Sequence, residues 1–296
     1  MVEIRSHHHA TEKNYHAAIT ENFPQLSIET WEPLHEGWAN RTFLVNQEFV
    51  FRFPKHQVAA HALVREIRLL TKLAPTVPLP SPQYLYHGQP TQHYPFVFGG
   101  YAFIEGTPLD QCPSHVQSAS WWKPPLGAFL TALHCFPVDR VQDLFETDVY
   151  TTPQAWQEGI TKMHGKIQTH IFPLLTHKQQ EELNIYFKQV IANPSIFCFT
   201  PVLIHQDFYS HNILVDVNRE TVTGIIDWGS CTIGDPAEDV GDLVAYYDGV
   251  IDEGWYSRCA FYRHTAPLPD LLYVLEHNQP EKVASIMGKI DALWTP

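Results

Sequence analysis

The chain has little positive charge. Its 296 residues include 19 Lys and Arg against 32 Asp and Glu, so the formal net charge is −13 with histidine neutral. No basic run is present, whereas proteins that bind nucleic acids concentrate Lys and Arg at the phosphate contacts. We therefore expect no nucleic-acid partner, and a small cationic molecule is the kind of ligand that this charge favours.

Long apolar runs and a cysteine framework are also missing. The longest apolar stretch, near residues 196–204, is well short of the about 20 residues that a membrane-spanning helix needs, and no apolar signal core is present at the N-terminus. The five cysteines are odd in number and widely spaced, without a C-x-x-C pair. We expect a cytoplasmic protein that has no membrane contact and whose thiols are reduced and buried.

The composition favours a compact fold. Charged residues make up 17% of the chain, hydrophobic residues 44% and aromatic residues 13%, which argues against intrinsic disorder and coiled coils. A length of 296 residues accommodates two domains, or two lobes of one fold, at about 100–200 residues each. These features do not indicate an oligomeric state.

Periodicity predicts an α+β chain with a β-rich first part and a helical second part. The first part is predicted to contain helices at 11–23 and 57–73 and strands at 42–45, 48–53 and 95–104. The second part is predicted to contain helices at 126–134, 153–167, 178–191 and beyond 274, and a hairpin of strands at 213–217 and 221–226. A break after the strand at 95–104 is the predicted hinge.

Three oxygen-bearing side chains flank the predicted hairpin. Asp207 and Asn212 lie in the polar loop that enters it, and Asp227 follows its return strand. Mg²⁺ prefers oxygen ligands and takes phosphates and waters as well, so one carboxylate and one amide from the protein suffice. A second carboxylate can accept the proton of an attacking hydroxyl. The combination indicates a phosphoryl-transfer site, although either aspartate alone would be explained as a capping residue.

Around these residues the chain resembles the aminoglycoside phosphotransferase family, whose fold is that of protein kinases. The resemblance is carried by H-x-D-x-x-x-x-N at 205–212, D-x-G at 227–229, I-G-D-P-x-x-D at 233–239 and L-x-x-F-L-x-x-L-H at 126–134. Residues 36–54 are further similar to the nucleotide-binding entry of the aminoglycoside 2″-phosphotransferase and macrolide phosphotransferase branches. The resemblance implies a two-lobed kinase-like fold with a nucleotide-binding lobe at 1–103, a hinge at 104–106 and a catalytic and substrate-binding lobe at 107–296.

The resemblance also implies roles for the residues of the loop and hairpin. Asp207 would be the catalytic base, and His205 would shape the catalytic loop. Asn212 and Asp227 would bind Mg²⁺. Each role agrees with the oxygen chemistry of these side chains.

Arg52 stands where the family usually has a lysine that reaches the α- and β-phosphates. Arginine keeps the charge and can bind two oxygens at once, but its planar guanidinium differs in shape from an ammonium. Lys55 is an alternative phosphate ligand. Glu66 has only apolar residues three and four positions away on its helix, so we expect it to pair with Arg52. The alternative is a Glu66 side chain that bends out to water.

Other parts of the nucleotide site are less distinctive. Gly37 would lie in a loop that covers the phosphates, although with one glycine this segment also fits an ordinary hairpin turn. The resemblance places the hinge backbone from Phe103 to Gly106, which includes Glu105, against the nucleotide base. Nothing in these side chains separates ATP from GTP.

Two acidic groups follow the hairpin. Asp235 is predicted to cap a helix that begins at Pro236, and Asp239 resembles the acid that anchors the catalytic loop in kinase-like folds. Further on lies an acidic and aromatic segment that would suit the ammonium groups of a cationic substrate. Its acids are Asp248, Asp252 and Glu253.

Taken together, the sequence predicts a small-molecule kinase that uses Mg²⁺ with ATP or GTP to phosphorylate a hydroxyl of an aminoglycoside-like or other small acceptor. The alternatives are a choline, homoserine or macrolide kinase of the same superfamily, and a pseudokinase-like nucleotide-binding module. A protein Ser/Thr kinase fits least well, because no A-P-E segment follows Asp227.

Overall fold

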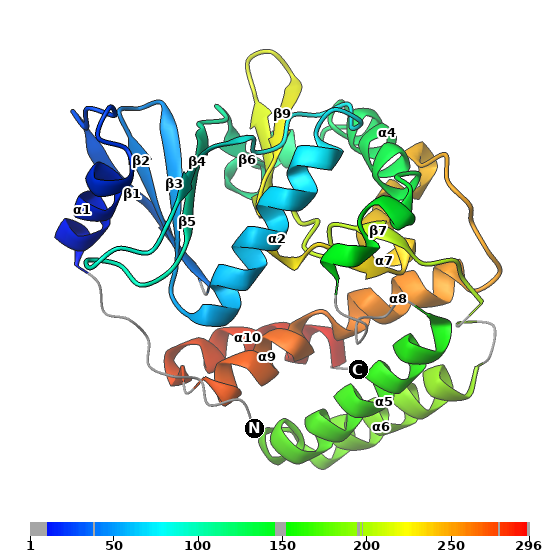
Figure 1. The fold of residues 1–296 in the computed structure, drawn as a ribbon. Helices are drawn as coiled ribbons and strands as arrows, with labels where there is room; N and C mark the ends of the chain where they lie inside the picture. Colours follow the sequence, from blue (N-terminus) through cyan, green and yellow to red (C-terminus); the bar gives the residue numbers. More distant parts are fainter. Residues whose placement is uncertain are drawn as a thin grey trace. The chain divides into compact units, whose positions relative to one another are not determined.

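The structure is a computed structural model that describes residues 11–37, 39–145, 152–193, 196, 198–277 and 279–294. The chain separates into two compact units (Figure 1). Unit 1 comprises Met1–Phe136 and His205–Cys231, and unit 2 comprises Pro137–Ile204 and Thr232–Pro296. These units group the chain differently from the predicted lobes, whose boundaries at the 104–106 hinge stay a prediction.

Unit 1 contains an antiparallel five-stranded sheet in the order β1-β2-β3-β5-β4. Its strands are β1 Trp31–Glu36, β2 Asn40–Val45, β3 Phe49–Pro54, β4 Tyr84–Gly88 and β5 Phe98–Ala102. The strands predicted at 42–45 and 48–53 are present as β2 and β3, which pair with each other. Val45 pairs with Phe49, so residues 46–48 form the connection, and Asn46 and Gln47 both have positive φ.

Two helices cover opposite faces of this sheet (Figure 1). α1 (Glu12–Asn22) packs Tyr15 against the rings of Phe43 and Phe53. α2 (Gln57–Leu73) lies on the face to which Arg52 points. Phe53 and Arg52, which are neighbours in β3, therefore point to opposite faces of the sheet.

α2 begins and ends where the sequence predicts. His56 caps it by accepting a hydrogen bond from the Ala59 amide, which satisfies one of the free N–H groups of the first turn. Its buried stripe contains one acidic side chain among apolar ones, Glu66, which is only 1% exposed.

A second, three-stranded sheet of unit 1 carries the predicted hairpin. Its order is β6-β8-β9, formed by β6 Thr107–Pro108, β8 Ile213–Asp216 and β9 Thr221–Ile225. At the predicted hinge Gly106 has φ +149°, and a Cβ there would collide with the side chain of Thr223. Unit 1 also contains α3 Ser114–Gln117, α4 Lys123–His134, and the 3₁₀ turns η1 Leu109–Gln111, η6 Ser210–Asn212 and η7 Trp228–Ser230.

Unit 2 is mainly helical. Its α-helices are α5 Pro153–His170, α6 His177–Ala192, α7 Pro236–Val240, α8 Trp255–Thr265, α9 Pro267–Glu276 and α10 Pro280–Trp294. It also contains the antiparallel strands β7 Val202–Ile204 and β10 Thr232–Gly234, and the 3₁₀ turns η2 Val138–Arg140, η3 Gln142–Leu144, η4 Phe172–Leu174 and η8 Gly241–Tyr246. Leu183, Phe187, Phe261 and Leu271 contribute to its fully buried core.

Some expectations differ from the structure. The strands β1 and β4 and the helix α8 were not anticipated, because none of the three has a clear periodic pattern in the sequence. Cys135 and Cys198 are exposed, so the expectation of buried thiols holds only for Cys112 and Cys231. The described part of the chain has no helix long and apolar enough to span a membrane.

Candidate active site

The loop predicted to be catalytic is closed by a contact between Asp207 and Asn212. The Asn212 amide nitrogen donates to the backbone oxygen and to Oδ2 of Asp207, both at 2.9 Å. This leaves the amide oxygen of Asn212 as the acceptor, which is the atom that a magnesium ion needs. Asn212 is buried, whereas Asp207 is partly exposed. The contact therefore orients the carboxylate and keeps it accessible.

Aromatic rings hold this loop in place. Phe208 stacks on Phe129 of α4 with the two ring centroids 5.8 Å apart. His205 is fully buried, lies 4.6 Å from the Trp228 ring and forms a hydrogen bond through Nε2 with the Ile226 carbonyl at 3.1 Å. His205 thus links the loop to the residue before Asp227, and its role in shaping the loop stays a prediction.

Asp227 is delivered by β9 to the neighbourhood of this loop. The Ile226 amide donates to the Asn212 carbonyl at 3.0 Å, so the two predicted metal ligands are tied together through the backbone. Asp227 has φ +62° and ψ +66°, a left-handed conformation that aspartate tolerates better than most residues. Gln206, next to Asp207, is also left-handed at φ +66°. Such backbone conformations are concentrated at functional sites.

Arg52 connects two carboxylates of unit 1. Its Nη1 donates to Glu66 Oε1 and its Nη2 to Asp227 Oδ1, each at 2.7 Å. The side chain of Arg52 is 5% exposed, that of Asp227 51%. The predicted Arg52–Glu66 pair is present, and the planar guanidinium uses a separate nitrogen for each of the two carboxylates.

The electrostatic environment keeps Arg52 and Asp227 charged. Burial opposes the charge of Arg52, yet Glu66, Tyr84 and Asp227 raise its pKa well above the usual value. Arg52 lowers the pKa of Asp227. Burial raises the pKa of the Glu66 carboxyl, and Arg52 opposes that shift. Asp227 is therefore ionised at neutral pH and suited to a cation.

Tyr84 is a member of this group that sequence reasoning missed. Its hydroxyl donates to Glu66 Oε1 at 2.8 Å, and burial, with the nearby Glu66 charge, raises the pKa of the phenol well above its usual value. Arg65 was also missed: its Nη2 donates to the Gly229 carbonyl at 2.8 Å. α2 therefore contacts the segment after Asp227 directly.

His211 was missed as well. Its Nε2 lies 3.7 Å from Asp207 Oδ1, and the Asp207 carboxylate raises the pKa of the imidazole. A polar loop residue next to Asn212 is the only sequence signal that could have indicated it.

The loop that would cover the phosphates is tied to Lys55. Lys55 Nζ donates to the Gly37 carbonyl at 2.7 Å, and the Lys55 amide donates to the Ala39 carbonyl at 2.8 Å. Trp38 lies outside the described residues. Gly37 connects β1 and β2, so it does lie in a hairpin turn; its phosphate role and that of Lys55 stay predictions.

At the predicted hinge, the Phe103 amide donates to the Glu48 carbonyl at 2.7 Å. This N–H is therefore used within the sheet and does not face a nucleotide base. The Glu105 side chain is exposed. The role of Phe103 and Glu105 in binding the base stays a prediction. It would depend on the other backbone groups of the hinge.

The acids predicted to bind the acceptor lie in unit 2 and differ in environment. Asp252 accepts from both Nη1 and Nη2 of Arg258, at 2.8 and 2.6 Å, and Arg258 is fully buried. Its carboxylate therefore holds a buried arginine, which was not anticipated. Asp248 and Glu253 are exposed.

The remaining acids lie in or before α7. Asp235 caps the helix through a 3.0 Å bond from the Ala237 amide, as predicted, and its second oxygen accepts from Arg258 Nε at 2.6 Å. Asp239 is buried. Its anchoring role stays a prediction.

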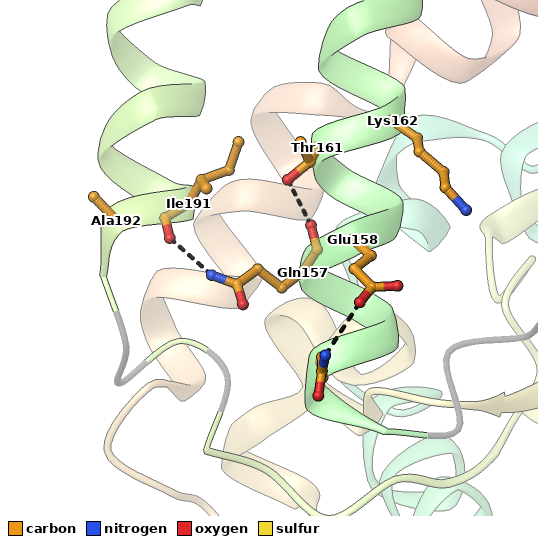
Figure 2. A pocket seen from close by; sticks show the side chains of 7 residues that line it. Gln157, Glu158, Thr161, Lys162, Ile191 and Ala192 are labelled. Atoms are coloured by element: carbon orange, nitrogen blue, oxygen red, sulfur yellow. Dashed lines mark hydrogen bonds between the residues drawn. The ribbon is translucent and has the colours of Figure 1, made fainter.

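A depression of about 880 Å³ lies between α5 and α6 (Figure 2). Gln157 spans it by donating to the Ile191 carbonyl at 3.3 Å. Its lining consists of Gln154, Gln157, Glu158, Thr161, Lys162, Ile191 and Ala192. None of the predicted site residues is among them.

The donor set fits a magnesium ion. Among the described residues, no group of three or more His, Cys, Asp or Glu side chains is arranged to hold a metal. Asn212 and Asp227 together offer an amide oxygen and a carboxylate, of which Oδ1 accepts from Arg52. Two hard oxygen donors from the protein are what Mg²⁺ uses when phosphates complete its shell.

Comparison with known proteins identifies the family of the chain. Residues 30–271 match the model of the phosphotransferase enzyme family. The chain belongs to this family. The GDP and kanamycin complex of APH(2″)-IIIa matches with a TM-score of 0.83 and 27% identity, over 95% of this chain and 98% of that one.

Two further phosphotransferases resemble this chain. The apoenzyme of macrolide 2′-phosphotransferase MphH from Brachybacterium faecium shares the fold at a TM-score of 0.70 and 17% identity, over 95% of this chain and 98% of that one. Viomycin phosphotransferase from Streptomyces vinaceus is 28% identical over 142 residues, 44% of this chain. That match spans 47% of the curated relative, about half its length. The two-lobed kinase-like fold class and the resemblance seen in the sequence are confirmed.

Proposed function

We propose that this chain is a small-molecule kinase that transfers the γ-phosphate of a Mg²⁺-bound nucleotide to a hydroxyl of an aminoglycoside-like or other small acceptor. The observation that carries the proposal is the arrangement of Asp207, Asn212 and Asp227, with the first two in direct contact and Asp227 held by Arg52. Family membership and the GDP complex of a relative support it.

The residues would divide the chemistry as follows. Asp207 accepts the proton of the acceptor hydroxyl while the hydroxyl oxygen bonds to the γ-phosphorus. The bond between that phosphorus and the β–γ bridging oxygen breaks, which releases the nucleoside diphosphate. Asn212 orients Asp207, and Arg52 presents positive charge to the phosphates. Mg²⁺, held by Asn212 and Asp227, would neutralise charge on the phosphate oxygens.

A cationic acceptor is favoured by the net charge of −13 and by the kanamycin complex of a relative. A macrolide, choline or homoserine acceptor remains the alternative within the family, and the donor is ATP or GTP. The cytoplasmic location expected from the sequence belongs to the same proposal.

A pseudokinase-like module is the second candidate, favoured by the Arg52 substitution and the single glycine at Gly37. It is the weaker one, because a module that only binds nucleotide has no need of an oriented base such as Asp207.

The two candidates differ in turnover. The purified chain is incubated with MgATP or MgGTP and separate acceptors, including kanamycin, a macrolide and choline, and diphosphate release and acceptor phosphorylation are measured. Phosphorylation of one acceptor supports the proposal. A melting temperature that rises with Mg-nucleotide without release of diphosphate with any acceptor favours the binding module.

A further inference from the structure

Tyr84, which is partly exposed, closes a triangle of polar contacts with the buried Arg52–Glu66 pair. Glu66 Oε1 accepts from Arg52 Nη1 at 2.7 Å and from the Tyr84 hydroxyl at 2.8 Å, while Nη1 and the hydroxyl oxygen are 3.5 Å apart. All three side chains belong to unit 1 but come from different elements, β3, α2 and β4.

The sheet is built to let Tyr84 reach this pair. β4 is the edge strand, and β5 lies between it and β3. Gly99 of β5 is the register partner of Arg52, and a Cβ on Gly99 would lie 2.7 Å from the Tyr84 ring. This is closer than side-chain atoms approach one another, so the glycine leaves the space that the ring occupies. Tyr101 packs edge-on against that ring at 5.2 Å.

The contact has a specific effect on the guanidinium. A carboxylate and an arginine prefer to pair through two parallel hydrogen bonds. Glu66 does not pair with Arg52 in this way. Its Oε1 accepts from both Arg52 Nη1 and the Tyr84 hydroxyl, and the buried Oε2 has no partner in the part of the chain that the structure describes. If Oε2 rotated towards Arg52, it would draw Nη2 away from Asp227. The hydroxyl of Tyr84 opposes that rotation because it fixes Oε1.

We propose that Tyr84 is a positioning residue of the nucleotide site, which holds Glu66 so that the second arm of Arg52 stays directed at Asp227 and the phosphates. The inference rests on the proposed function, since it assigns a role within Mg-nucleotide binding. In this role Tyr84 acts through Glu66 and Arg52, the two side chains that its hydroxyl contacts.

The test compares Tyr84→Phe with Tyr86→Phe. Tyr86 lies on the same strand, packs against Phe49 and Phe51, and its hydroxyl makes no hydrogen bond to the described residues. Isothermal titration with MgGDP and MgADP is expected to show about three- to tenfold weaker binding for Tyr84→Phe and a change within about twofold for Tyr86→Phe. Equal dissociation constants for the two variants would overturn the inference.

A double-mutant cycle separates positioning from packing. Lysine at position 52 has one nitrogen and no second arm to be drawn away. Tyr84→Phe should therefore weaken binding much less in an Arg52→Lys background than in the wild type. Full additivity of the two effects would show that Tyr84 serves packing alone.

Gly99→Ala provides a second route in case Tyr84→Phe does not fold. It displaces the Tyr84 ring without altering the hydroxyl, so the same loss of affinity is expected, and unchanged affinity would contradict the proposal. A wild-type chain that binds neither MgGDP nor MgADP would overturn the proposed function and this inference with it. Normal wild-type binding together with an unaffected Tyr84→Phe would remove only the inference.

Discussion

Arg52 donates through Nη2 to Oδ1 of Asp227 at 2.7 Å, although 175 positions separate the two residues. The contact connects the central strand of the five-stranded sheet to the end of the β8–β9 hairpin. One guanidinium, that of Arg52, therefore holds the carboxylates of both Glu66 and Asp227. The positive charge of Arg52 lies between two carboxylates and keeps the site organised before a nucleotide binds.

Removing that cation should destabilise the fold. Arg52→Met leaves Glu66 buried without its ionic partner, so we expect the free energy of unfolding to fall by about 3–5 kcal/mol. Arg52→Lys should cost clearly less because the charge remains. Urea unfolding monitored by fluorescence measures both. Arg219→Met is the matched control, since the exposed Arg219–Asp216 pair should contribute no more than about 1 kcal/mol; equal losses at both positions would contradict the buried bridge.

Replacing the proposed base should affect turnover and spare binding. In Asp207→Asn the amide can no longer accept the proton of the acceptor, so we expect kcat to fall by about 10²- to 10⁴-fold, with the dissociation constant of the Mg-nucleotide nearly unchanged. Asp216→Asn is the control, because its carboxylate belongs to the same hairpin and its contacts are with the turn: it accepts from the Asn218 and Arg219 amides and pairs with the Arg219 side chain. Retained turnover in Asp207→Asn would refute the assignment.

Changing Asp227 should instead make nucleotide binding insensitive to metal. Arg52 holds the pKa of this carboxyl below its usual value, so Asp227 is ionised throughout the neutral range. Asp227→Asn keeps the shape and removes the charge. We expect wild-type affinity for GDP or ADP to fall strongly when EDTA removes Mg²⁺, and the variant to bind weakly in both conditions. An EDTA effect of equal size in the two proteins would exclude Asp227 as a ligand.

Local patterns made much of unit 1 predictable. The helix at 57–73 and the β2–β3 hairpin follow from periodicity and turn residues, which act between neighbours in the chain. The Arg52–Glu66 pair could also be inferred, since a carboxylate within an apolar stripe requires a partner.

Non-local pairing explains what was missed. Tyr84 lies in a five-residue strand directly after a proline-rich stretch, and its contact with Glu66 depends on β5 and on the missing Cβ of Gly99. Asp252 appears in the sequence as one acid among several. Only the folded chain shows that Arg258 takes both of its oxygens.

The packing of α5 on α6 should weaken at mildly acidic pH. His164 is buried, stacks on Phe187 at 4.8 Å, and its Nε2 has no partner among the described residues. Burial lowers the pKa of this imidazole. The unfolded chain therefore binds the proton more readily than the folded one, and stability present above about pH 6.5 is lost as the pH falls.

The variant His164→Phe tests this dependence because it keeps the stacked ring and cannot be protonated. The melting temperature is measured at pH 7.5 and 5.5 for both proteins. We expect a larger drop for the wild type than for the variant. Identical drops would assign the acid sensitivity to other histidines of the chain.

The acidic segment of unit 2 should divide into two kinds of residue when mutated. Asp252→Asn removes the ionic partner of the buried Arg258, so we expect a loss of stability. Asp248→Asn and Glu253→Gln alter exposed side chains and should leave the melting temperature within a degree or two, since surface changes rarely exceed about 0.5 kcal/mol.

If Asp248 and Glu253 bind ammonium groups of the acceptor, the KM for kanamycin should rise about three- to tenfold in each variant, with the KM for nucleotide unchanged. Steady-state kinetics with kanamycin as the probe measures both constants. An unchanged kanamycin KM in Asp248→Asn and Glu253→Gln would place acceptor binding outside this segment, because two exposed carboxylates that contact a polycation must weaken its binding when their charge is removed.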